Sequence, residues 1–373
     1  MRVTHIIKAT RIAGAERHLL TLLPALVQRG ADVSLILIHE PDKPVADFAD
    51  ALTAGGVTVV RVPIPRHIDF TLFGRLRRAL RQLKPDIAHT HLLHADLYGV
   101  IAARLAGVRK VVISRHNDDQ FRTLLPFRLI HNLLWGMSSG GIAISEAIRQ
   151  FCIRVEGVRP TKIQTIHYGL TLPIQQADRQ RARAALSTEL KLPADALILG
   201  VVCRLIAQKG IAYALRALPR IDNAVLVIAG EGSLRAALEA EARALGIAER
   251  VHFLGWREDT AALMAAFDIF LAPSLWEGFG LVLLEAMAQQ TPIIASSVSA
   301  IPEIIVDRET GRLVPPRDPV ALAAAIHDLQ ADPALRRHMG LIGQDRLETV
   351  FNADHMTAQT YTLYSRLMGR KDN

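Results

Sequence analysis

The chain has 373 residues, half of them apolar and only 5% aromatic, which favours two domains with buried parallel strands over an antiparallel sandwich. Its two cysteines fit neither a metal-binding spacing nor a disulfide framework, and no apolar run reaches the roughly 18 residues of a membrane span. The first eight residues read as a strand and not as a signal peptide, so we expect a cytoplasmic protein.

The formal charge of +8 is concentrated in the first half. Residues 1–170 contain 23 Lys and Arg and 13 Asp and Glu, a net of +10, whereas residues 171–373 contain 21 and 23, a net of −2. The basic residues are not interleaved with stacking aromatic side chains, so we expect no nucleic-acid partner. An anionic acceptor, or peripheral contact with the inner face of the cytoplasmic membrane, fits this half better. Residues 72–84 form an amphipathic pattern that suits either a solvated helix or a membrane patch.

Strand-like runs alternate with helical patterns along the chain. In the first half the strand-like runs fall at residues 3–8, 32–38, 57–61, 86–89, 110–114 and 141–144. The alternation breaks at residues 168–178, which contain Pro173, and we interpret this stretch as a linker. It then resumes with strand-like runs at residues 196–202, 223–229, 250–254, 268–272 and 292–296.

Two successive βα series predict an α/β protein with two doubly wound, Rossmann-like parallel-sheet domains and a cleft between them. The expected domains are residues 1–170 and 178–352. Ligands of such sheets bind at the carboxyl ends of the strands, in the loops that lead into helices. The segments that follow the predicted strands are therefore the places to search for a site.

Two of these segments suit a phosphate. Gly14 follows the first strand and opens a helix, where a close backbone and free N–H groups can receive an anion, although a tight turn explains the residue equally well. Arg204 ends the first strand of the second domain, and Lys209 follows five residues later at a helix start. Two such cations can neutralise a diphosphate, although a chance pair of solvated cations is the competing interpretation.

Two carboxylates belong to the most specific stretch of the sequence. Glu277 lies in a glycine-containing loop after a strand, and Glu285 lies in the next helix on an apolar face. A carboxylate among apolar side chains is costly unless it accepts strong hydrogen bonds, which a ribose diol can donate. The alternative is an internal cap or a buried ion pair.

At this stretch the chain resembles a known family. Glu277 and Glu285, with seven residues between them and with Gly278-Phe279-Gly280 in the loop, resemble the signature of retaining glycosyltransferases of family 4, which have the GT-B fold. The resemblance extends over nearly the whole chain, through Gly14-Ala15-Glu16, Arg204 to Lys209-Gly210, Ile301-Pro302-Glu303-Ile304 and Val314-Pro315-Pro316. Where the family usually has an Asn before the linker glycine, this chain has His167-Tyr168.

The resemblance implies a role for each domain. Residues 1–170 would bind the acceptor, with a C-terminal helix at 353–373 packing back on them, and residues 178–352 would bind the nucleotide sugar. The implied catalytic residues are His116, near the anomeric centre, and Glu277, on the sugar hydroxyls. The implied donor-binding residues are Gly14, Arg204, Lys209, Phe279, Gly280, Leu281 and Glu285. Weaker candidates for the acceptor side are His91, Arg115, Asn117 and Asp118.

The expected activity is metal-independent transfer of a hexose, with retained configuration, from a UDP-sugar or, second, a GDP-sugar. No Asp-x-Asp motif occurs in the chain, so we expect no metal site and no cofactor. The acceptor would be a hydroxyl of a glycan, a lipid-linked sugar or a small molecule, in cell-surface polysaccharide or lipopolysaccharide synthesis. Two alternatives are a nucleotide-sugar epimerase or hydrolase of the same fold and an inactive nucleotide-sugar-binding subunit.

Overall fold

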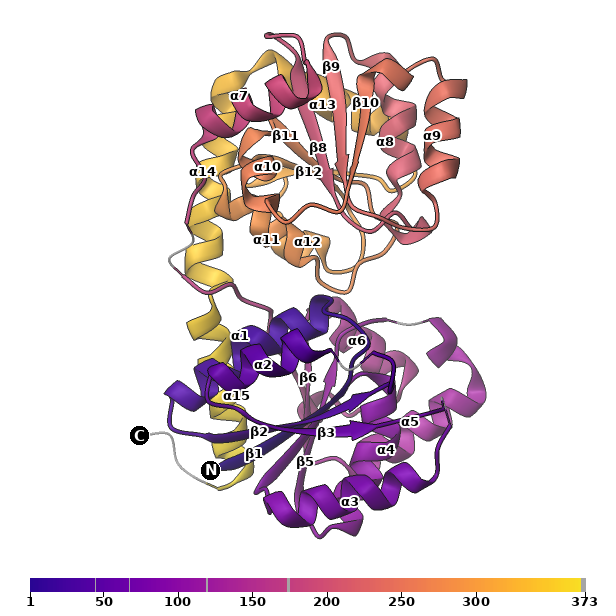
Figure 1. Cartoon of the computed structure of the whole chain (residues 1–373), viewed down its shortest axis with the longest axis vertical. Helices are drawn as coiled ribbons and strands as arrows, with labels where there is room; N and C mark the ends of the chain where they lie inside the picture. Colours follow the sequence, from indigo (N-terminus) through magenta and orange to yellow (C-terminus); the bar gives the residue numbers. More distant parts are fainter. Residues whose placement is uncertain (44, 67, 119, 173–174, 370–373) are drawn as a thin grey trace. The chain divides into compact units, whose positions relative to one another are not determined.

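The structure is a computed structural model that describes residues 1–43, 45–66, 68–118, 120–172 and 175–369. It divides into two compact units, Met1–Thr171 with Asn352–Asn373 and Leu172–Phe351 (Figure 1). Pro173 of the expected linker and residues 370–373 of the expected C-terminal helix lie outside the described residues.

The first unit is built on a seven-stranded parallel sheet. Its strands are β1 (Arg2–Lys8), β2 (Asp32–His39), β3 (Thr58–Pro63), β4 (Ile87–His91), β5 (Lys110–Arg115), β6 (Gly140–Ala143) and β7 (Ile163–Thr165). Their order in the sheet is β3-β2-β1-β4-β5-β6-β7. The order reverses between β1 and β4, so the carboxyl ends of these two strands form the switch point at which such sheets bind ligands.

Helices cover both faces of this sheet. They are α1 (Gly14–Gln28), α2 (Ala46–Ala54), α3 (Thr71–Leu83), α4 (Leu92–Leu105), α5 (Leu125–Met137), α6 (Glu146–Val155) and α15 (Ala353–Leu367). Helix α15, drawn in yellow, packs against α1, and both contribute to one core with the sheet (Figure 1). The central strands are buried almost throughout, as expected for parallel strands with helices on both sides.

The last helix joins the first unit where the chain leaves that unit. Leu170 forms a parallel bridge with Asn352, and the Ala353 amide donates to the Leu170 carbonyl oxygen at 2.8 Å. A Cβ at Gly169 would lie 2.3 Å from the Asn352 carbonyl oxygen, so this approach requires glycine. The Asn352 side chain accepts a hydrogen bond from the His355 amide and caps α15.

The second unit repeats the architecture with six parallel strands. They are β8 (Leu197–Val202), β9 (Ala224–Ala229), β10 (Val251–Gly255), β11 (Ile269–Ala272), β12 (Ile293–Ser296) and β13 (Gly311–Val314), in the sheet order β10-β9-β8-β11-β12-β13. The helices are α7 (Arg179–Leu190), α8 (Ile211–Ala217), α9 (Arg235–Ala244), α10 (Thr260–Ala266), α11 (Leu281–Ala288), α12 (Ile301–Ile304), α13 (Pro319–Ala331) and α14 (Pro333–Val350). The order reverses between β8 and β11, which places their carboxyl ends side by side.

The eleven expected strands are confirmed, with ends that differ by a few residues at most. The sequence pattern missed β7 and β13, which are three and four residues long. Runs this short offer no periodicity to detect. Among the described residues, no helix has the length and apolar character needed to cross a bilayer.

Candidate active site

The loops that follow β8 and β11 are hydrogen-bonded to each other. The first passes through a 3₁₀ turn at Ala207–Lys209 into α8, and the second runs from Pro273 to Gly280 into α11. The Leu275 amide donates to the Gln208 carbonyl oxygen at 2.7 Å, and the Gln208 side-chain amide donates to the Trp276 carbonyl oxygen at 3.0 Å. These bonds fix one loop against the other, so that side chains from both meet at the sheet edge.

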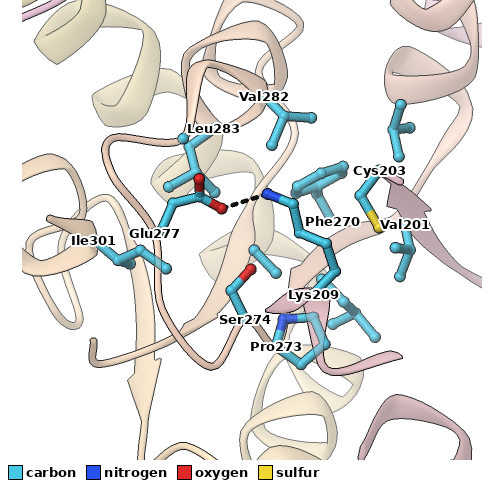
Figure 2. Close-up of a pocket in the computed structure, with 14 residues that line it drawn as sticks. Val201, Cys203, Lys209, Phe270, Pro273, Ser274, Glu277, Val282, Leu283 and Ile301 are labelled. Atoms are coloured by element: carbon cyan, nitrogen blue, oxygen red, sulfur yellow. Dashed lines mark hydrogen bonds and ion pairs between the residues drawn. The ribbon is translucent and has the colours of Figure 1, made fainter. Parts of the chain in front are cut away.

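Lys209 and Glu277 meet in this way. The Lys209 ammonium donates to a Glu277 carboxylate oxygen, and each side chain is 14% exposed. Figure 2 shows the Lys209 side chain reaching toward Glu277 across a pocket that Ser274, Phe270 and the backbone of β8 and β11 also line. The pocket holds about 320 Å³ of empty space, part of it open to solvent. Two residues singled out from the sequence are thus brought together.

Glycine is required at both ends of this arrangement. Gly210, directly after Lys209, has φ +61°, and a Cβ there would lie 2.0 Å from the Pro273 carbonyl oxygen. Gly280 has φ +99° and precedes α11, so it turns the chain into the helix next to Glu277. Helix α11 therefore begins at Leu281, directly after the loop that carries Glu277.

Gly280 also lines the pocket, whereas three other expected donor residues of this unit, Arg204, Phe279 and Glu285, do not. Arg204 is exposed, and within the described part of the chain it has no ion-pair partner. Glu285 is partly buried in α11, one turn beyond Leu281. Phe279 is buried and packs edge-on against Phe351. Arg204 is therefore free to move toward an anion, whereas Phe279 anchors the loop.

Sequence reasoning missed the two side chains of the pocket that carry a hydroxyl or thiol group, Ser274 and Cys203. Ser274 is buried directly after β11. It could have been predicted from the sequence, because it follows a strand in the same stretch as Glu277 and Glu285. Cys203 gave no such signal. Burial raises the pKa of the Cys203 thiol to about 12, so this sulfur is no nucleophile near neutral pH.

Gly14 opens α1 in the first unit. It is exposed, and no described atom lies within 4 Å of the position that a Cβ would take. The Ala13 amide donates to the Glu16 carboxylate at 3.0 Å, which completes the start of the helix. Packing within this unit therefore does not require glycine at residue 14, and a ligand could approach its backbone.

His116 follows β5 and is buried, with both ring nitrogens engaged. Its Nδ1 bonds to the Tyr168 hydroxyl, and its Nε2 lies 3.0 Å from Nδ1 of His91. Burial lowers the pKa of His116 well below its ordinary value, so the ring is neutral near pH 7. The histidine expected at the anomeric centre is thus held inside the first unit by its own neighbours.

The weaker candidates for the acceptor side divide into buried and accessible residues. Arg115 is fully buried and pairs with Asp96 and Glu156, and His91 is buried beside His116. Asn117 is exposed and Asp118 is partly buried. The interpretation of Arg115 as an acceptor contact is wrong, because its guanidinium is fully used inside the core.

The apolar side of α3 is also part of the core. Leu72, Leu76 and Leu80 are buried, and α3 packs on α4. The interpretation of this helix as a membrane patch is therefore wrong, and its arginines form an ordinary solvated face. A different helix, α5, exposes leucines on its surface.

Two family models match the chain. Residues 12–172 match the model of Glycosyltransferase Family 4, and residues 196–332 match the model of Glycosyl transferases group 1. The chain belongs to glycosyltransferase family 4. The loops that hold Lys209 and Glu277 lie within the second matched region.

Relatives of this glycosyltransferase match most or all of its length. The lipopolysaccharide core biosynthesis glycosyltransferase LpsD of Rhizobium meliloti is 27% identical, with both chains covered completely. The UDP-Gal:alpha-D-GlcNAc-diphosphoundecaprenol alpha-1,3-galactosyltransferase of Escherichia coli is 28% identical over 80% of each chain. The crystal structure of Anabaena HepE in complex with UDP and glucose matches with a TM-score of 0.85 and 20% identity, over 98% of this glycosyltransferase and all of HepE. The fold is accordingly GT-B.

Proposed function

We propose that this glycosyltransferase transfers a hexose from a nucleoside-diphosphate sugar to an acceptor hydroxyl, with retention and without a metal ion. A UDP-sugar is the first choice of donor and a GDP-sugar the second. The Lys209–Glu277 pair is the observation that supports this best, since it sets a cation and a carboxylate at two adjoining strand ends. The UDP and glucose bound by HepE, and the UDP-Gal in the name of the Escherichia coli relative, agree with this donor class.

In the proposed complex, Lys209 and Glu277 bind different parts of the donor, the diphosphate and the sugar. Lys209, joined by the exposed Arg204, binds the diphosphate, and Glu277 then accepts hydrogen bonds from sugar hydroxyls. Glu285 takes the ribose hydroxyls, and the backbone at Phe279 to Leu281 faces sugar and phosphate. The Lys209 ammonium, which neutralises Glu277 in the free protein, exchanges the carboxylate for phosphate oxygens, and the released carboxylate then accepts hydrogen bonds from the sugar hydroxyls.

In the proposed reaction the acceptor hydroxyl attacks the anomeric carbon on the face from which the diphosphate leaves. The new carbon–oxygen bond forms as the bond to the diphosphate breaks, and the hydroxyl proton passes to the departing phosphate oxygen. Lys209 and Arg204 stabilise the negative charge that develops on the leaving group. Gly14 and His116 belong to the first unit, and their expected roles at the phosphates and the sugar rest on the family resemblance alone.

Donor choice is tested by thermal unfolding with nucleotides. UDP should stabilise the full chain by about 2.7 kcal/mol at a hundredfold excess over its Kd, because it binds the folded state alone. GDP should stabilise it less and ADP least. Transfer from UDP-hexoses should continue in EDTA, and NMR of the product should show the donor's anomeric configuration. An inverted product, or activity that chelation removes and Mg²⁺ or Mn²⁺ restores, would refute the mechanism.

The proposed acceptor belongs to cell-surface polysaccharide or lipopolysaccharide synthesis, and peripheral contact with a membrane accompanies it. The names of LpsD and of the undecaprenol-linked galactosyltransferase support this class. The surface that suits the contact is the outer face of α5, where Leu125, Leu129 and Leu133 are 65%, 63% and 64% exposed at four-residue spacing. Arg128 is exposed on the same helix, in the half of the chain with a net charge of +10, which complements anionic lipid.

Removing this apolar face should weaken lipid binding. The double variant Leu129→Glu/Leu133→Glu should lower binding to phosphatidylglycerol vesicles by at least about tenfold, because an exposed leucine gains about 1.5–3 kcal/mol when fully buried. Cosedimentation measures the effect. The matched control is Val320→Glu/Leu341→Glu, two exposed apolar positions in the second unit. Equal losses in both variants would assign vesicle binding to net charge and not to α5.

A further inference from the structure

The core of the first unit contains four buried histidines on one face of its sheet. His5 of β1 is the register partner of His89 of β4, and His91 of β4 is the register partner of Ser114 of β5. His116 lies two residues beyond Ser114, on the same side. His5, His89 and His91 are 0% exposed. Apolar side chains usually fill such positions, so this polar layer calls for a physical explanation.

The four rings belong to one unbroken series of hydrogen bonds, which we term the histidine chain. It begins at the Tyr168 hydroxyl, which bonds to His116 Nδ1, and His116 Nε2 lies 3.0 Å from His91 Nδ1. His91 Nε2 is 2.9 Å from His5 Nδ1, and His5 Nε2 is 3.4 Å from the Tyr364 hydroxyl. The Tyr364 hydroxyl is 2.6 Å from His89 Nδ1, and His89 Nε2 ends the series 2.7 Å from Ser114 Oγ. Every ring has its Nδ1 toward the Tyr168 end and its Nε2 toward the Ser114 end.

This uniform direction limits where the protons can be. Burial lowers the pKa of His5 to about 3 and the pKa values of the other three rings well below the ordinary value, so all four are neutral. A neutral imidazole has one N–H and one acceptor nitrogen, and each hydrogen bond needs a single hydrogen. Two patterns give a hydrogen to every link and also use the hydroxyl hydrogen of Tyr364: all four rings protonated at Nδ1, or all four at Nε2. A third pattern, in which Tyr364 accepts from both His5 and His89, would leave its buried hydroxyl hydrogen without an acceptor among the described residues.

Ser114 decides between the two patterns. Within the described part of the chain, its buried hydroxyl has no hydrogen-bond partner except Nε2 of His89. If His89 donated from Nε2, the Ser114 hydrogen would be buried without an acceptor, which costs about 1–3 kcal/mol. The Ser114 hydroxyl therefore donates to His89, and the remaining links follow in the same direction.

We propose that the histidine chain fixes all four imidazoles in the Nδ1–H tautomer, so that Ser114 and Tyr364 determine which nitrogen of His116 holds its proton. His116 then donates to the Tyr168 oxygen, so the proposal requires an acceptor for the Tyr168 hydroxyl hydrogen beyond the histidine chain. The residues of β1, β4 and α15 act as positioning residues for His116. Their effect on transfer rests on the proposed function, whereas the tautomers do not.

A metal ion held by His5, His89 and His91 is the competing explanation, since one nitrogen from each lies within 4.8 Å of the others. Zinc ligands are about 3.3 Å apart in a tetrahedral site with Zn–N bonds of about 2.0–2.1 Å. His5 Nδ1 and His91 Nε2 are only 2.9 Å apart, and in the described structure each ring nitrogen of the three residues already has a hydrogen-bonding partner. The chain therefore accounts for these rings more completely.

The tautomers are measured directly by NMR of the full chain labelled with ¹⁵N-histidine at pH 7, because protonated and unprotonated ring nitrogens have well-separated ¹⁵N shifts. His5, His89, His91 and His116 should all show a protonated Nδ1 and an unprotonated Nε2. A single ring protonated at Nε2 would overturn the proposal. So would one equivalent of zinc in the purified protein, with shifts of His5, His89 and His91 that change on chelation.

The positioning role is tested with Tyr364→Phe, which removes one hydroxyl from the middle of the histidine chain and keeps the ring. We expect kcat to fall by about tenfold, as for one buried hydrogen bond left unmade, with the donor KM unchanged. The ¹⁵N shifts of His116 should change as well. Tyr361→Phe, on the same helix and outside the chain, is the matched control. Unchanged kcat and His116 shifts in folded Tyr364→Phe would overturn the positioning role and leave the proposed transferase reaction untouched.

Discussion

Replacing Lys209 with alanine should lower kcat/KM about 10²–10³-fold, which is the usual effect of losing one group that stabilises the charge of the transition state. Lys209 supplies a partly buried cation at the end of β8, beside the start of α11. Its loss also leaves the Glu277 carboxylate without its partner, next to an incoming diphosphate. Affinity for free UDP, measured by calorimetry, should therefore fall together with turnover.

Glu277→Gln should separate the two roles of the pair. The carboxamide keeps the size of the side chain but removes the charge that orients sugar hydroxyls, so kcat should fall heavily. Affinity for UDP should be preserved or higher, because Lys209 no longer exchanges a carboxylate for phosphate.

Arg337→Ala, an exposed cation on α14, is the control for loss of one positive charge and should leave both quantities unchanged. If Glu277→Gln lost UDP affinity as severely as Lys209→Ala did, Glu277 would belong to the diphosphate site and the proposed sugar contact would be wrong.

Glu156→Gln should destabilise the first unit by about 3–5 kcal/mol, the range found when one partner is removed from a buried ion pair. The Glu156 side chain is 0% exposed and accepts from Arg115 at 3.0 Å, from Arg122 at 3.1 Å and from the Trp135 indole. A neutral amide leaves both guanidinium groups in the core without sufficient countercharge. Urea unfolding measures the change.

The control for this variant is Glu241→Gln, which removes the partner of Arg216 at the surface. Such exposed pairs contribute about 0–1 kcal/mol. A similar small change for Glu156→Gln would mean that water or the remaining Asp96 compensates the buried arginines.

The destabilisation by Glu156→Gln should depend on pH. Burial alone would raise the pKa of Glu156, but Arg115 and Arg122 outweigh it and lower the pKa to about 2, from an ordinary value of 4.5. A carboxylate with a lowered pKa stabilises the fold above its unfolded pKa and loses this effect as pH falls through the folded one. The difference between wild type and variant should be full near neutral pH and shrink between pH 4.5 and about 2. A difference that is constant over this range would assign the effect to shape and not to charge.

The meeting of Lys209 with Glu277 could be predicted from sequence because it follows from topology. Each residue comes after a buried strand, and in doubly wound sheets the strands on either side of the switch point present their carboxyl ends together. The two strands, β8 and β11, are neighbours in the second sheet. The glycines at 210 and 280 were recognisable by the same logic, because sharp loops between strand and helix need positive φ.

The histidine chain could not be predicted in the same way. Strands covered on both faces are apolar throughout, so no alternation shows which face a given histidine occupies. The contact of His89 with Tyr364 also joins residues 275 positions apart, through a helix that returns from the other end of the sequence. Similarly, the pattern of residues 72–84 revealed an apolar stripe on α3 but not that α4 covers it.

The return of α15 also affects how the protein is synthesised. The second unit is inserted between two segments of the first, and Tyr364, Met356 and Leu363 of the later segment belong to the first unit's core. On the ribosome, the first 171 residues therefore emerge with part of their apolar surface uncovered. They stay so while residues 172–351 are made, roughly 10–35 s at 5–20 residues per second. We therefore expect the first unit to reach its complete core only after the second unit has been synthesised, and to expose apolar surface to chaperones until then.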